Sequence, residues 1–69
     1  MDYIVHYRTK TGILKRKSCS TKEDVEDQFN KLFKRRIEAV ARDKDENIIG
    51  EIHKRLVNKT HKWDWWLQT

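Results

Sequence analysis

The feature that most constrains this chain is a run of apolar residues at helical spacing within residues 20–35. Four of them fall at i, i+4, i+7 and i+8 and so share one face of a helix: Val25, Phe29, Leu32 and Phe33. No other segment keeps this spacing for more than two turns. The sequence therefore predicts one amphipathic helix, and the rest of the chain must cover its apolar face.

Both ends of this helix carry the expected signals. Ser20 and Glu23 have the spacing of a capping box, in which a hydroxyl and a carboxylate satisfy two free backbone amides. Thr21 and Asp24 offer the same arrangement one residue later. Acidic residues crowd the first turns and basic residues the last, as the helix dipole favours. The helix start is thus predicted to within one residue.

Strand patterns flank the helix on both sides. Five segments have the composition or alternation typical of strands: residues 3–8, 13–18, 36–42, 48–57 and 61–68. The first two segments are joined by a polar turn, and so are the last three, so consecutive strands on each side of the helix can pair as hairpins. We therefore predict an α+β fold with a small antiparallel sheet of four to five strands. The order is β-β-α-β-β(-β), one amphipathic helix packs on one face, and a single compact domain spans residues 1–69.

The aromatic residues are the main source of core volume. A chain of 69 residues buries only about 60% of the surface that it exposes when unfolded, so its core must be well filled. Trp63 and Trp65 alternate with polar residues and are predicted to cover Phe29 and Phe33. Gly50 within a strand indicates a bulge or the close approach of a bulky group.

Strand residues that alternate with the core-facing ones are predicted to face outward, on the side of the sheet that lacks the helix. Trp66 points away from Trp65 on a strand and is therefore expected on this outer face. The alternation places three aliphatic residues beside it: Ile4, Val40 and Ile49. An apolar surplus on an open face is typical of a binding or association surface.

Basic residues, which give the chain a net charge of +5, gather in two of the predicted strands. If those two strands lie near each other, the side chains form a band that can neutralise several phosphates, with an indole as a stacking platform. The alternative interpretation is that they protect a strand edge and keep a small domain soluble. The predicted binding residues are Lys15, Arg16, Lys17, Lys54, Arg55 and Trp66.

Sequence patterns give no support for catalysis. The three histidines and the single cysteine lack the spacing of a metal site, and no glycine-rich phosphate loop is present. Cys19 precedes the helix, whose dipole can lower a thiol pKa, but no base or oxyanion site accompanies it. We expect no enzyme activity, no metal and no cofactor.

Two classes of function remain open. The first is a small cytoplasmic module that contacts nucleic acid through the open sheet face. The second is a protein-interaction module, as a homodimer or as a regulator or inhibitor of a nucleic-acid enzyme. A membrane partner is not expected, because no apolar run approaches about 20 residues and the N-terminus lacks a secretion signal.

Overall fold

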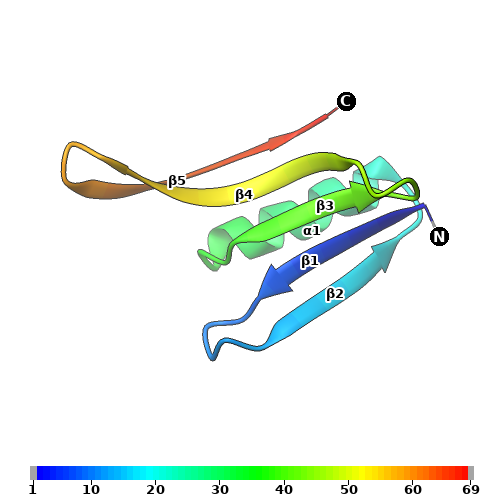
Figure 1. The fold of residues 1–69 in the computed structure, drawn as a ribbon, viewed down its shortest axis with the longest axis horizontal. Helices are drawn as coiled ribbons and strands as arrows, with labels where there is room; N and C mark the ends of the chain where they lie inside the picture. Colours follow the sequence, from blue (N-terminus) through cyan, green and yellow to red (C-terminus); the bar gives the residue numbers. More distant parts are fainter. Residues whose placement is uncertain (1, 69) are drawn as a thin grey trace.

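The computed structural model describes residues 2–68, and these form one helix packed on a five-stranded antiparallel sheet (Figure 1). The predicted α+β fold is confirmed, with the fifth strand present. The elements are β1 (Tyr3–Arg8), β2 (Leu14–Cys19), α1 (Lys22–Lys34), β3 (Ala39–Asp43), β4 (Ile48–Val57) and β5 (Thr60–Leu67).

The strand order, which the sequence left open, is β2-β1-β3-β4-β5. β1 and β3 pair at the centre of the sheet, while β2 and β5 form its edges. The two strands that carry the basic clusters, β2 and β4, are therefore separated by β1 and β3. Every strand pair is antiparallel: three pairs are hairpins of consecutive strands, and the fourth joins β1 to β3, which β2 and α1 separate in the chain.

The helix begins at the second of its two predicted caps. Thr21 Oγ1 accepts a hydrogen bond from the Asp24 amide at 3.2 Å. Acidic residues occupy the first turn and Lys31 and Lys34 the last, so charge and dipole agree. The amide donors at the start of α1 thus acquire a side-chain acceptor.

The end of the helix shortens the predicted third strand. Arg36 takes a left-handed conformation with φ 57°, and its amide donates to the Phe33 carbonyl at 3.1 Å. The Ile37 amide donates to the Leu32 carbonyl at 3.0 Å, which completes a Schellman motif. These residues close the helix, so β3 begins at Ala39 and not at residue 36.

The core lies between α1 and the sheet face that it covers. Small side chains of the central strand β3, Ala39 and Ala41, leave room for the fully buried Phe29. The rings of Phe29 and Trp65 meet edge to face, with centroids 5.8 Å apart. Trp63 is partly buried against the same cluster. The prediction that an indole covers Phe29 and Phe33 is confirmed for Trp65, whose ring meets both of them.

A bulge in β4 moves Ile49 from the predicted outer face into the core. Ala41 pairs with Gly50 and Arg42 with Ile48, so Ile49 is the extra residue. Ile49 is only 4% exposed, whereas Ile48 is 43% exposed. The prediction that Ile49 faces outward was wrong because it continued strict alternation through the bulge that Gly50 itself indicated.

The β4–β5 hairpin extends past the end of the helix (Figure 1). Asn58 and Lys59 turn the chain with φ values of 50° and 66°, as a two-residue hairpin turn of type I′ requires. β5 therefore starts at Thr60, one residue earlier than predicted. Within residues 2–68, no helix combines the length and apolar character needed to cross a membrane.

Candidate nucleic-acid interface

The structure divides the predicted binding residues between the two faces of the sheet. Lys17 pairs with the buried Val5, so Lys17 and Lys15 lie on the face that carries the helix. Arg16 is one residue out of phase and pairs with His6 on the opposite face, which we call the open face. The basic run on β2 therefore serves two separate surfaces.

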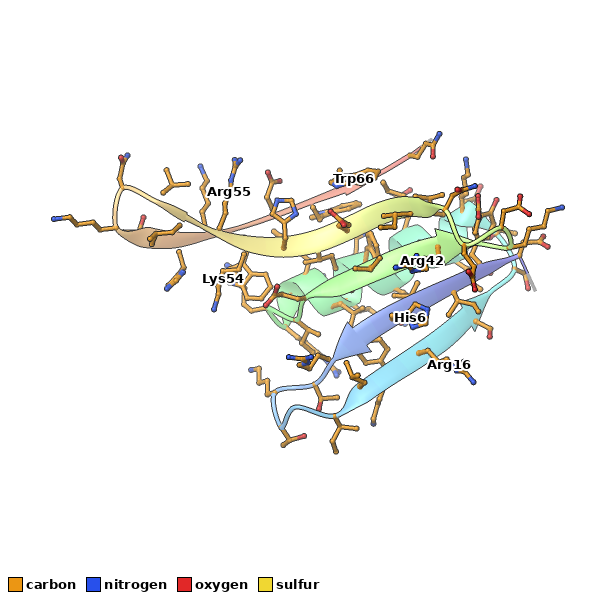
Figure 2. The ribbon with its side chains drawn as sticks, viewed as in Figure 1. His6, Arg16, Arg42, Lys54, Arg55 and Trp66 are labelled. Carbon is orange, nitrogen blue, oxygen red and sulfur yellow. The ribbon has the colours of Figure 1, made fainter. Side chains whose placement is uncertain are left out.

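The predicted residues of β4 and β5 are divided in the same way. Lys54 and Arg55 leave β4 in opposite directions in Figure 2. Lys54 pairs with Trp63 on the helix side. Arg55 and Trp66 lie on the open face, and the Trp66 side chain is 44% exposed there. The single basic band predicted from the sequence does not form, because β2 and β4 are not neighbours.

A groove of about 760 Å³ lies between β2 and the C-terminal half of α1. We call it the cationic groove, because five of its lining residues are basic and none of those described is acidic. Three elements contribute the basic side chains: the β1–β2 turn, strand β2 and helix α1 with its C-cap. They are Lys10, Lys15, Lys17, Lys31 and Arg35.

Sequence reasoning found two of these five residues, Lys15 and Lys17. It missed Lys10, which it placed only in a turn, and Lys31 and Arg35, which it used only as cations that complement the helix dipole. For the last two, the spacing of four residues was the available signal, because it aligns them on one flank of the helix. Which flank faces β2 could be known only from the strand order.

The rest of the groove lining is of two kinds. Tyr7 and Ile37, which also pack against the core, give it an apolar wall together with the buried Leu32. Thr9 and Thr11 place hydroxyl groups at its end, and their Oγ1 atoms are hydrogen-bonded to each other at 2.9 Å. The groove thus combines cations, neutral hydrogen-bonding groups and an aromatic ring.

The cations of the groove have no acidic partner in the described chain. Within residues 2–68 the one ion pair joins Arg55 Nη2 to Asp64 Oδ2 at 3.6 Å, on the open face. Asp24 and Asp27 lie nearer the N-terminus of α1 and line an adjoining depression of about 280 Å³ together with two of the groove cations, Lys17 and Lys31. The groove itself has no carboxylate among its described lining residues, and none of its cations forms an ion pair within residues 2–68.

The open face, in contrast, mixes both signs of charge. Its cations are partly occupied: Arg55 faces Asp64, and Arg42 Nη1 donates to the Glu46 carbonyl at 3.0 Å. Glu51 lies half-buried between Val40 and Trp66. This face therefore offers a weaker attraction to a polyanion than the groove does.

Cys19 is buried, and its thiol has the opposite tendency to the one expected beside a helix start. Burial raises the pKa of the Cys19 thiol, Asp24 raises it further, and Lys17 acts in the lowering direction. The thiol is thus held in its neutral form, which is the less reactive one. Among residues 2–68, no group of three or more potential ligand side chains gathers closely enough to hold a metal ion.

Comparison of the chain with protein-family models, curated protein sequences and solved structures gave no match. The chemistry of the surfaces themselves is therefore what indicates a ligand.

Proposed function

We propose that this protein is a non-catalytic nucleic-acid-binding module and that its contact surface is the cationic groove. The observation that carries the proposal is the convergence of five basic side chains from three elements on a groove without an acidic residue. Each lysine or arginine that neutralises a phosphate releases condensed counterions, which supplies most of the affinity for nucleic acid. The open face, which the sequence favoured, is the less suitable of the two surfaces because its cations are interspersed with carboxylates.

The uncharged lining of the groove favours a nucleic acid over a simpler anion. Hydroxyl groups such as those of Thr9 and Thr11 are common partners of phosphate and sugar oxygens. Tyr7 supplies an aromatic ring beside the lysines, and a ring next to cations is the combination that holds an unstacked base. A binding mode through backbone charge with little base readout is expected.

The test compares two double charge reversals in the full chain. Lys15→Glu with Lys17→Glu removes two cations from the groove. Lys54→Glu with Lys62→Glu makes the same change in net charge, from +5 to +1 with two units per substitution, on the β4–β5 hairpin. Affinity for a mixed-sequence oligonucleotide, single-stranded and duplex, is measured as a function of salt.

The groove pair is expected to lower affinity by at least about tenfold and the log–log salt slope by about 1.4–1.8, given about 0.7–0.9 for each of the two lost phosphate contacts. The hairpin pair is expected to have a much smaller effect. Equal losses in both variants, or a larger loss in the hairpin pair, would contradict the groove as the contact surface. Polyglutamate that competes as well as DNA at equal charge would contradict nucleic acid as the ligand class.

A further inference from the structure

One row of side chains crosses the whole open face and contains one residue from each strand. Strand pairing places its members side by side in the order of the sheet. From the β2 edge to the β5 edge the row reads Arg16, His6, Val40, Glu51 and Trp66. Figure 2 shows Arg16 and Trp66 at opposite edges, with His6 between them.

This row is asymmetric in charge. Its β2–β1 half carries the guanidinium of Arg16 and the imidazole of His6, while its β4–β5 half carries the carboxylate of Glu51 and the indole of Trp66. Arg16 and Glu51 are three strand spacings apart, about 14 Å at ~4.8 Å per spacing, so they cannot pair within one chain. Glu51 forms no ion pair within residues 2–68.

We propose that the open face is a homodimer interface, occupied by the open face of a second copy of this chain. A two-fold axis parallel to β3 places β2 of one protomer over β5 of its partner, and this reverses the row upon itself. Arg16 then lies over the partner's Trp66 and next to the partner's Glu51. Val40 meets its own counterpart at the axis. The pattern is self-complementary, as an interface with two-fold symmetry requires.

The contacts created in this way are of kinds known to stabilise interfaces. A guanidinium over an indole face is a favourable cation–π arrangement, and arginine and tryptophan are enriched at interface hot spots. Two sheets that pack face to face keep their strands within about 30° of each other, which this axis allows. The two longer extents of the molecule, 39 and 27 Å, leave room for the roughly 800 Å² that each partner buries in a standard interface.

Arg42 is the residue that this arrangement must accommodate, because it also belongs to the central strand β3. Its guanidinium donates to the Glu46 carbonyl at 3.0 Å, in the turn beyond the end of β3. That hydrogen bond draws the charge toward the edge of the face and away from the row that contains Val40. Because this axis keeps the strand direction, the two guanidinium groups lie at the same end of the interface, outside the row that contains Val40, and each is held by the Glu46 carbonyl of its own chain.

The experiment is a charge swap read by sedimentation equilibrium or light scattering over a range of protein concentrations. Arg16→Glu and Glu51→Arg, each alone, place like charges across the interface and are expected to weaken dimerisation by on the order of tenfold or more. The double variant Arg16→Glu with Glu51→Arg restores opposite charges across the axis and is expected to recover the dimer. Lys22→Glu, on the helix, is a matched control and is expected to dimerise like the parent chain.

Recovery in the double variant is specific to this geometry, because Arg16 and Glu51 are too far apart to affect each other within a monomer. A second measurement needs no substitution: amide NMR shifts followed on dilution of the parent protein should change at residues 6, 16, 40, 51 and 66. A parent chain that stays monomeric at the highest concentration overturns the proposal. A dimer that persists in both single charge reversals also overturns it. Dilution shifts that are confined to the β2 edge overturn it as well.

Discussion

The two flanks of α1 are built from the same sheet but in different ways. On the β5 flank, the indole of Trp65 and the side chain of Leu67 close over Phe29, and Gly50 lets them come close. On the β2 flank, the corresponding sheet positions are Lys15 and Lys17, and the cationic groove remains open beside them. One flank is sealed by aromatic packing, whereas the other is lined with charge.

The difference shows how a very small domain can separate stability from recognition. A helix on a sheet needs apolar contact along its buried stripe, and here that contact comes from the centre of the sheet and from β5. The β2 edge is then free to carry charged side chains over long aliphatic stems. If this division is correct, substitutions on the β5 flank should change mainly the unfolding free energy, and substitutions on the β2 flank should change mainly the affinity for nucleic acid.

The largest effect is expected at the centre of the sealed flank. Phe29 is fully buried, so Phe29→Ala should cost about 3–5 kcal/mol of unfolding free energy. A cost of that size is most of the stability available to a domain of this length, so the folded baseline should be largely lost in urea titrations. Phe33→Ala is the matched control and should cost about 1–2 kcal/mol, because Phe33 is only half-buried. Equal costs would mean that the core is not centred where the ring contacts indicate.

Gly50→Ala tests how tightly that flank is closed. A Cβ at Gly50 would lie 2.8 Å from Leu67 Cδ1, 2.8 Å from the Trp66 carbonyl oxygen and 2.9 Å from Phe29 Cε2. Backbone and a packed ring cannot both move aside, so we expect a loss of about 1–3 kcal/mol. The control is Gly12→Ala, where φ is +86° but nothing lies within 4 Å, so only conformational strain of about 1 kcal/mol is expected. A cost at Gly50 no larger than at Gly12 would show that the flank is loosely packed.

The sequence predicted most of the sealed flank because its signals are local. Helical spacing identified Phe29, and period-two spacing identified Trp63 and Trp65. Gly50 indicated a bulge or the close approach of a bulky group, and the structure has both. The bulge also limited the prediction, since its position decides which of Ile48 and Ile49 is buried. No propensity distinguishes two adjacent isoleucines.

The cationic groove was less predictable because it depends on contacts between distant parts of the chain. Lys15 and Lys17 were recognised as a basic run, but strand parity then separates them from Arg16. Lys31 joins them only because β2, and not β5, lies on that flank of α1. The strand order depends on the pairing of β1 with β3, two strands that are separated in the chain by β2 and α1. No local sequence pattern encodes that pairing.

A smaller effect is expected where α1 ends, at the border between the two flanks. Arg36 has φ 57°, which an L residue adopts at a cost, and Arg36→Gly should remove that strain. The gain should be partly offset because Arg36 Cζ lies 5.5 Å from the centroid of the Phe33 ring. A net stabilisation of about 0.5 kcal/mol is expected in urea or thermal unfolding. Lys59, at φ 66° in the β4–β5 turn, makes no cation–π contact with an aromatic ring of residues 2–68, so Lys59→Gly should gain slightly more. The reverse ranking would contradict this explanation.

The smallest effect on stability is expected in the open flank. Lys15→Glu with Lys17→Glu should change the unfolding free energy by less than about 0.5 kcal/mol, because both side chains are exposed. An acid at position 15 or 17 gains attraction to Lys31 and Arg35, but an acid at position 17 also meets repulsion from Asp24 and Asp27, so the two contributions partly cancel even at low salt. The measurement is the urea midpoint at low and high salt. A loss above about 1 kcal/mol would show that the lysine stems are part of the core, in which case a loss of nucleic-acid affinity in this variant would no longer separate recognition from folding.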